Sequence, residues 1–544
     1  MTASDLPLAV HRVRAAYDRI QATDRPEIWI SLRPRAEVEA EAAALDPQLP
    51  LAGRLLAVKG NIDVAGLPTT AGCPSYAYEP ERDAPVVAAL RAAGAIVLGT
   101  TNLDQFATGL VGTRSPYGAV HSVADPARVA GGSSSGSAVA VALGIADLAL
   151  GTDTAGSGRV PAAFNGIVGL KPTPGLVPTE GVVPACASLD CVTVFARTLP
   201  EAREAFTHMA TATVRPPRRE PGPWRIAIVT PDGLGEMDPG WREAYEAATA
   251  RLAVAGAELQ SIDPAPFLEA AAMLYEGAFV AERYAAVGTF IDKQTDDLDP
   301  TVAAIITRAR DIPAHRLYSD QRHLDSLKAK ALDALGDADA LLLPTTPGHP
   351  TLAEVAADPL GSNARLGRFT NSTNLFGLAA VAVPAGTVGG LPFGAMLIGP
   401  AGTDERLAQL AELLTPRVPL AVVGAHLTGQ PLNAQLLALG GRFVRATTTA
   451  PEYRLHALRT DPPKPGLVHT RDGGAAIEAE VWELPPEGLG ALVAALPRPM
   501  TIGSVALADG TAAPGFLCEP DALHGAADIT ATGGWRAHLA AQGE

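Results

Sequence analysis

Two glycine- and serine-rich segments carry the residues that could perform acyl-transfer chemistry. Residues 131–137 read GGSSSGS and residues 151–159 read GTDTAGSGR. Glycine lets the backbone turn tightly and approach a ligand, so such loops build either phosphate sites or oxyanion holes. A phosphate loop is disfavoured because no Gly-Lys-Ser/Thr sequence follows the first glycines at the required spacing. Serine nucleophiles on these loops are therefore the chemistry to consider.

A serine hydroxyl is a poor nucleophile until a base removes its proton. No histidine lies between Ser133 and Ser157, and the nearest one, His121, has no matching aspartate signal. A Ser-His-Asp triad is therefore not favoured, although sequence order alone leaves it open. Lys59 directly follows the apolar run at residues 55–58, and burial would lower the pKa of its amine enough for it to act as a base.

The spacing of these residues resembles that of the amidase signature family. Lys59 precedes Ser133 by 74 residues, and Ser133 precedes Ser157 by 24. The resemblance extends over about residues 50–400 and departs from many members at Ser135 and Ala155, where glycine is commoner. It implies that Ser157 is the nucleophile, that Ser133, after a cis peptide bond, relays the proton, and that Lys59 is the base. It also implies an oxyanion hole made by the backbone N–H groups of Thr154, Ala155, Gly156 and Ser157.

Residues 101–118 and 274–284 resemble the allophanate hydrolase branch of this family. In that branch a tyrosine and an arginine eight residues apart hold the substrate carboxylate, which assigns this role to Tyr275 and Arg283. On one helix this spacing is about two turns, so both side chains can face one pocket. The resemblance implies a small-molecule substrate, allophanate (urea-1-carboxylate), hydrolysed to ammonia and carbon dioxide in urea or cyanuric-acid nitrogen catabolism.

A second domain is expected after the proline-bearing segment at residues 416–419. We predict an amidase domain over residues 1–418 and a small α+β domain over 421–544. Residues 422–433 and 533–536 resemble the allophanate hydrolase C-terminal domain, whose fold is similar to that of γ-glutamyl cyclotransferases. In some members this domain has a role in the later decarboxylation and in others a role in assembly. His426 is its one candidate for chemistry.

Each candidate residue also has an ordinary structural explanation. Lone lysines are mostly solvated, and serines in glycine-rich loops mostly cap helices. We expect Ser134 and Ser135 to be helix N-caps. Asp153 and Arg159 are expected to hold the loop by their charges, and the cysteines at 186 and 191 to be core residues. The two spacings taken together favour catalysis for Lys59 and its serine partners.

The elements that position these residues predict an α/β fold, and the family resemblance implies a mixed sheet flanked by helices. Helical patterns cover residues 1 to about 45 and almost all of 265–335. Apolar runs predict strands that alternate with helices. These strands are expected at residues 55–58, 95–99, 146–151, 340–343 (ending at Pro344), 379–383 (ending at Pro384), 420–424 and 477–484.

Composition limits the other functions. A formal net charge of −16 disfavours a nucleic-acid partner, and 47% hydrophobic with 18% charged residues suits a large folded core. Four scattered cysteines predict neither a disulfide framework nor a metal site. We expect no cofactor, no membrane span, a cytoplasmic location and a homodimer. The competing classes are an amidase of other specificity, including one of the transamidosome type, and a non-enzymatic scaffold, which would be expected to have lost Lys59 or one of the two serines.

Overall fold

The computed structural model describes residues 7–219, 221–460 and 462–543. The chain divides into two compact units, one up to Leu414 and one from Thr415. Each is described by itself.

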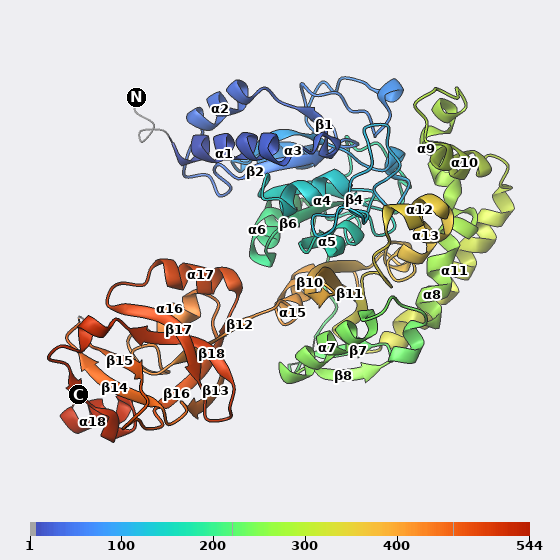
Figure 1. Ribbon diagram of the computed structural model, residues 1–544. Coiled ribbons are helices and arrows are strands. Elements are labelled where there is room, and N and C mark those ends of the chain that lie inside the picture. Colours follow the sequence, from blue (N-terminus) through green and yellow to red (C-terminus); the bar gives the residue numbers. More distant parts are fainter. Residues whose placement is uncertain (1–6, 220, 461, 544) are drawn as a thin grey trace. The chain divides into compact units, whose positions relative to one another are not determined.

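The first unit is built on one mixed sheet with helices on its faces (Figure 1), which confirms the predicted fold class. Its eleven strands run, in spatial order, β1 (Trp29–Leu32), β3 (Ile96–Thr101), β2 (Leu55–Lys59), β4 (Leu148–Asp153), β6 (Cys191–Ala196), β5 (Val168–Lys171), β10 (Ala379–Val388), β11 (Leu391–Gly399), β9 (Ala340–Pro344), β7 (Arg225–Ile228) and β8 (Glu258–Ser261). Strand β2 pairs in parallel with both β3 and β4, and β7 does so with β8 and β9, whereas the other pairs are antiparallel.

The helices of this unit mostly alternate with strands as far as β8, and α8 to α11 then run consecutively between β8 and β9. The helices are α1 (Leu8–Thr23), α2 (Arg35–Ala44), α3 (Pro85–Ala92), α4 (Ser135–Ala142), α5 (Val160–Phe164), α6 (Leu199–Met209), α7 (Trp241–Val254), α8 (Ala265–Glu276), α9 (Ala281–Ile291), α10 (Pro300–Arg308), α11 (Ala314–Leu335), α12 (Leu352–Ala357), α13 (Pro359–Leu366), α14 (Asn371–Leu375) and α15 (Asp404–Ala411). Short 3₁₀ turns include η4 (Gln105–Ala107) and η6 (Ala278–Val280).

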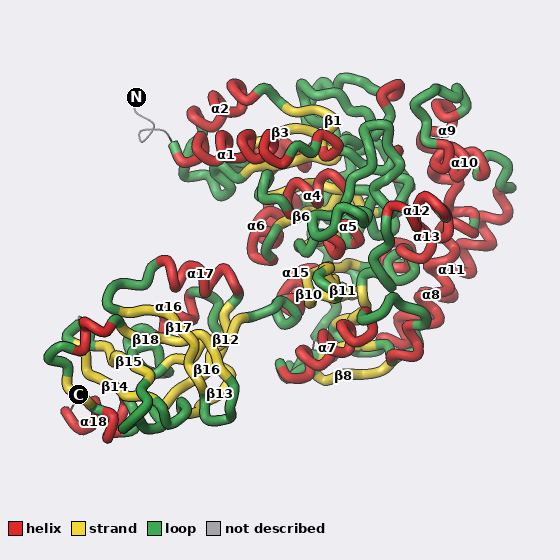
Figure 2. Tube along the Cα trace, in the orientation of Figure 1, coloured by secondary structure: helices red, strands yellow, loops and turns green. Residues whose placement is uncertain are grey.

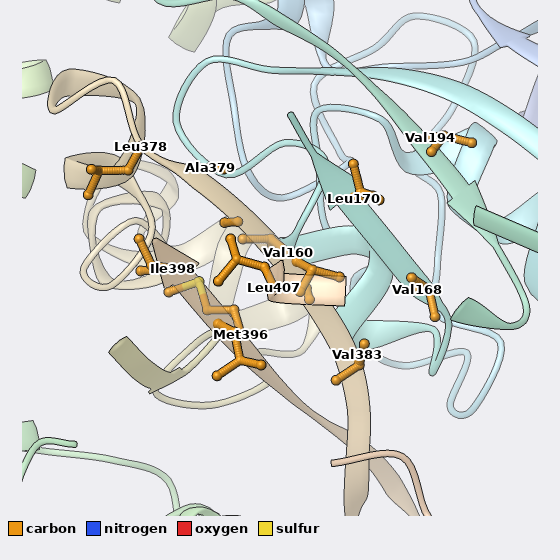
Figure 3. Packing of buried hydrophobic residues seen from close by; sticks show 14 of the residues in the cluster. Val160, Val168, Leu170, Val194, Leu378, Ala379, Val383, Met396, Ile398 and Leu407 are labelled. Carbon is orange, nitrogen blue, oxygen red and sulfur yellow. The ribbon is translucent and has the colours of Figure 1, made fainter. Parts of the chain in front are cut away.

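The core lies between the sheet and these helices. Figure 3 shows Val160 of α5 and Leu407 of α15 beside Met396 and Ile398 of β11. These side chains are apolar and almost wholly buried, so their removal from water stabilises the central strands. This packing thereby holds in place the strand ends from which the glycine- and serine-rich loops extend.

Several predicted elements differ from the observed ones. The N-terminal helical stretch is interrupted by β1, which pairs antiparallel with β3. The strand predicted at 146–151 is observed at Leu148–Asp153; just before it, the Asp147 carboxylate accepts the Leu55 N–H at 2.8 Å. Strand β10 continues beyond Pro384 through a bulge. Its pairing with β5 covers Ala380 to Ala382, so the missing proline N–H interrupts no bond on that side.

The second unit holds two antiparallel-rich sheets (Figure 2). Five strands are ordered β13 (Arg442–Thr448), β16 (Glu478–Leu484), β12 (Val418–Val422), β18 (Ala512–Cys518) and β17 (Met500–Ala506). Three more are ordered β15 (Lys464–His469), β14 (Tyr453–Leu458) and β19 (Ala527–Asp528), with helices α16 (Asn433–Ala438), α17 (Pro486–Ala494) and α18 (Trp535–Gln542). Strand β12 starts and ends two residues earlier than the predicted strand at 420–424.

Candidate active site

The parallel pairing of β2 and β4 brings the candidate residues to one sheet edge. Val58 lies opposite Leu150 in this pair, so the strands end together. Lys59 is the last residue of β2, and the loop containing Ser157 follows β4. Helix α4 is fixed to β4 by the Ser137 hydroxyl, which donates to the Leu150 carbonyl at 2.8 Å. The loop before α4, which carries Ser133, therefore meets the other two at this edge.

Lys59 and Ser133 are in direct contact. The Lys59 Nζ atom lies 2.7 Å from Ser133 Oγ and 2.7 Å from Thr152 Oγ1, and none of the three side chains is exposed beyond 2%. Thr152 is a polar neighbour that the sequence analysis did not single out, because a threonine near a strand end carries no signal of its own. The Lys59 amine thus lies between two hydroxyls, one of which belongs to Ser133, the predicted proton relay.

The electrostatic surroundings make Lys59 a base near neutral pH. The pKa of its amine is lowered from 10.5 to about 7, chiefly by burial and to a smaller extent by the nearby Arg283. The carboxylates of Asp104, Asp190 and Asp153 act in the opposite direction. Desolvation is the larger effect, so a substantial fraction of this amine is neutral at pH 7.

Ser157 lies on the neighbouring turn. Its hydroxyl donates to the carbonyl of Gly109 at 3.5 Å, the outer limit of a hydrogen bond. Among the described residues it has no hydrogen bond to Ser133. The peptide bond between Gly132 and Ser133 is cis, as the family resemblance implies. Lys59 therefore contacts Ser133 directly, whereas Ser157 lies at the same edge of the sheet without a hydrogen bond to Ser133.

The turn that presents Ser157 is folded around a buried ion pair. The Asp153 carboxylate accepts the N–H of Gly156 at 2.8 Å and that of Gly158 at 3.0 Å. Its two oxygens lie 3.0 Å from the Arg159 guanidinium. Gly156 has φ of +133°, and a Cβ there would lie 2.4 Å from the Thr370 hydroxyl, so glycine is required. These two charges hold the loop, as their predicted structural role requires.

The predicted oxyanion donors are not equivalent. Gly156 has its N–H committed to Asp153, which removes it from the group of free donors. In the described part of the chain, the other three backbone N–H groups have no protein acceptor. These belong to Thr154, Ala155 and Ser157.

Two minor predictions have different outcomes. Ser134 stands at the N-cap position of α4, but its hydroxyl donates to the Thr152 carbonyl at 3.2 Å, and Ser135 is the first helical residue. Ser134 is therefore the N-cap residue as predicted, although its side chain makes no capping bond, and the prediction is wrong for Ser135. Cys186 and Cys191 are buried in the core, as expected.

Tyr275 and Arg283 meet although they do not share a helix. Helix α8 ends at Glu276 and α9 begins at Ala281, so the predicted continuous helix is wrong at Gly277. Nevertheless Arg283 Nη2 lies 3.4 Å from the Tyr275 hydroxyl, with the guanidinium carbon 5.4 Å from the ring centre. The α8–α9 break thus brings the two side chains together by a turn.

One short segment, residues 108–109, connects Arg283 to the edge of the sheet where Ser133 and Ser157 lie. Arg283 is 2% exposed and donates to the Thr108 hydroxyl at 2.8 Å. The next residue, Gly109, supplies the carbonyl that Ser157 contacts. No carboxylate of the described residues lies within ion-pair distance of this guanidinium.

His426 lies in the second unit, just after β12. Its Nε2 is 3.0 Å from Gln435 Oε1, and its ring stacks on Phe516 with centres 4.5 Å apart. Burial lowers the pKa of the imidazole. With Lys464 and mostly apolar side chains it lines a cavity of about 50 Å³.

The two sequence stretches that suggested the C-terminal domain are joined by Glu480, which the sequence analysis missed. Glu480 accepts the N–H of Thr428 at 2.9 Å and a bond from Arg536 at 2.6 Å. Arg536 also donates to the Thr428 carbonyl. This network fastens the C-terminal helix to the His426 loop.

Neither a cluster of metal-binding side chains nor a membrane-spanning helix is found in residues 7–219, 221–460 and 462–543. Within these ranges no group of three or more histidine, cysteine, aspartate or glutamate side chains could hold a metal ion. In the same ranges no helix is long and apolar enough to cross a membrane.

A mixed sheet that places a buried lysine in contact with a serine is the arrangement that the amidase signature resemblance implies. Comparison with known proteins specifies the family. The amidase family model matches residues 11–408, and the chain belongs to that family. The model for the allophanate hydrolase C-terminal domain matches residues 418–540. The predicted family, with its C-terminal domain, is confirmed.

Individual relatives agree with this assignment. The urea amidolyase of Saccharomyces cerevisiae is 42% identical over 94% of this chain, which spans about a third (31%) of that protein. A glutamyl-tRNA(Gln) amidotransferase component of Thermus thermophilus is 35% identical and matches over 74% of this chain and 92% of its own length. The allophanate hydrolase structure from Kluyveromyces lactis is 40% identical, with a TM-score of 0.70, covering 98% of this chain and 97% of that one.

Proposed function

We propose that this protein hydrolyses allophanate at its terminal amide. The observation that carries the proposal is the buried Arg283 guanidinium, whose hydrogen-bond partners among the described residues are the neutral groups of Thr108, Ala107 and Tyr275. An unpaired buried charge is costly, so it favours a ligand that brings the opposite charge. A substrate carboxylate would pair with the Arg283 guanidinium and place the adjoining amide near Ser133 and Ser157.

Acylation begins with proton transfer toward neutral Lys59. Lys59 takes the proton of Ser133, and Ser133 takes that of Ser157 after a rotation of the Ser157 side chain away from the Gly109 carbonyl. The Ser157 oxygen attacks the terminal amide carbon. The N–H groups of Thr154, Ala155 and Ser157 stabilise the resulting oxyanion. The proton returns through Ser133 to the leaving nitrogen, the C–N bond breaks, and ammonia departs.

Deacylation reverses the relay with water in place of the hydroxyl. Water loses a proton to the Lys59–Ser133 pair, its oxygen bonds to the acyl carbon, and the Ser157 ester bond breaks. The released N-carboxycarbamate carries two carboxylates on one nitrogen, and it loses carbon dioxide without a metal. Urea or cyanuric-acid catabolism would supply such a substrate.

The second unit is proposed to assist and not to cleave the amide. The residues placed in the amide-cleaving site, Lys59 to Arg283, belong to the first unit. We therefore propose an autonomous amidase domain over residues 1–418, with 421–544 serving decarboxylation through His426 or assembly. A cytoplasmic homodimer remains part of the proposal, and light scattering of the purified protein tests its oligomeric state.

The main alternative is an amidase of other specificity, because components of glutamyl-tRNA(Gln) amidotransferases are also relatives. Ammonia release from allophanate, glutamine, malonamate, biuret, urea and simple amides separates the two. We expect the highest kcat/KM for allophanate, with Ser157→Ala as the inactive control. Faster release from glutamine or from an uncharged amide would refute the proposed substrate.

A further inference from the structure

One buried carboxylate lies between the Ser133 loop and the segment 109–114, whose Gly109 carbonyl Ser157 contacts. Asp104 is fully buried after β3, and the acceptor roles of its oxygens are filled by backbone N–H groups. Oδ2 accepts those of Val111 and Gly112 at 3.2 and 3.0 Å, and Oδ1 accepts that of Arg114 at 3.0 Å. No lysine or arginine of the described residues lies within ion-pair distance of it.

Two glycines, Gly132 and Gly109, pack so closely against this carboxylate that neither position has room for a side chain. A Cβ at Gly132 would lie 2.0 Å from Asp104 Oδ2, and a Cβ at Gly109 would lie 2.5 Å from the same atom. Gly132 immediately precedes Ser133, whose carbonyl accepts the Asp104 N–H at 3.1 Å. Gly109 supplies the carbonyl against which Ser157 rests. A shift of the carboxylate would therefore displace the Ser133 loop directly and the Gly109 carbonyl beside Ser157.

We infer that Asp104 is a positioning residue that holds the Ser133 loop against the segment 109–114 and contributes negative charge to the surroundings of Lys59. The charges facing Lys59 are those of Asp104, Asp190 and Asp153 and the guanidinium of Arg283. Asp104 has the largest effect of the three carboxylates in raising the pKa of the amine. Its charge therefore offsets part of the burial effect and keeps Lys59 able to hold a proton in mid-reaction.

The test measures Ser157 reactivity without any substrate, although the inference rests on the proposed role of Ser157. The full-length protein is labelled with a fluorophosphonate from pH 5 to 9, and mass spectrometry follows modification of Ser157. In the wild type the rate should fall on the acid side, as Lys59 becomes protonated. A wild type unlabelled at Ser157 would refute the proposed nucleophile and this inference with it.

Two substitutions test the charge and the packing. Asp104→Asn removes the charge and replaces one acceptor oxygen with an NH2 donor, so labelling should slow. Its acid limb should also move to lower pH by about one unit, because the lost carboxylate no longer raises the Lys59 pKa. Asp104→Glu should leave the limb in place yet slow labelling roughly tenfold to hundredfold, because the packed glycines leave no room for another methylene. An unmoved limb in folded Asp104→Asn, or a wild-type rate in Asp104→Glu, would overturn the inference.

Asp297→Asn is the matched control. Asp297 also accepts a backbone N–H, that of Ser75 at 2.7 Å, but it is not among the charges that face Lys59. Its labelling rate and acid limb should match the wild type. If both Asp104 variants fail to fold while Asp297→Asn folds, Asp104 has only a folding role and the inference is wrong.

Discussion

Replacing Arg283 gives the sharpest test of the substrate assignment. In Arg283→Lys the positive charge stays, but a single ammonium replaces the planar fork that can hold both carboxylate oxygens. One charge-assisted hydrogen bond is worth about 1.5–3 kcal/mol. Since about 1.4 kcal/mol corresponds to a factor of ten, kcat/KM for allophanate should fall roughly 10- to 150-fold. Arg283→Met removes both bonds and the charge, at about 2–5 kcal/mol, and should cost roughly 30- to several-thousand-fold.

Stability should respond differently from activity. Because the described residues offer Arg283 no carboxylate partner, Arg283→Met removes an uncompensated buried charge and leaves none behind. We expect its Tm to be unchanged or raised. This outcome distinguishes a ligand-binding arginine from one that supports the fold.

The assay compares ammonia release from allophanate with that from an uncharged amide such as propionamide. Arg283→Met should lose most activity on the first and retain any activity on the second, since only the carboxylate contact is removed. Tyr275→Phe, which removes a hydroxyl 3.4 Å from the guanidinium, should lose about tenfold or less. Equal losses on the charged and uncharged substrates would refute the carboxylate role of Arg283.

Four other outcomes are expected. The kcat/KM of the wild type should fall about tenfold per pH unit below about pH 7, where the Lys59 amine gains a proton; a flat profile from pH 5 to 8 would contradict a lysine base. Ser157→Ala should abolish ammonia release with an unchanged circular dichroism spectrum, and retained activity would exclude Ser157 as nucleophile. Arg159→Met should destabilise the fold by about 3–5 kcal/mol in urea unfolding, because it leaves the Asp153 carboxylate buried and unpaired. A chain ending at Leu414 should still release ammonia from allophanate; a folded but inactive product would show that the second unit contributes to the amidase site.

The sequence predicted the position of the site better than its surroundings. Lys59 was expected to be buried because it follows an apolar strand, and the parallel pairing of β2 with β4 brings it to the edge of the sheet where the two serine loops lie. The catalytic roles of the three residues stay predictions. Asp104 and Thr152 were missed. Their importance arises from contacts between segments far apart in the chain, which no local pattern records.

The helix boundaries failed for a similar reason. Gly277 in a helical pattern is tolerated in many helices, so the sequence does not mark it as an end. In the fold the next N–H, that of Ala278, donates to the Asp320 carboxylate of α11 at 2.7 Å, and this distant partner stabilises the break. The continuation of β10 past Pro384 likewise depends on which neighbour strand is still paired.

The α8–α9 break has a consequence for how such enzymes diversify. The proposed carboxylate-binding pair stands on α8 and α9, which lie between β8 and β9 in the sequence. Lys59, in contrast, ends β2, Ser133 lies in the loop before α4, and Ser157 lies in the turn after β4. Substitutions within residues 265–291 can therefore change which nitrogen compound is accepted while the bond-breaking residues stay as they are. A gene for one amidase could in this way be recruited to a new nitrogen source by altering two short helices.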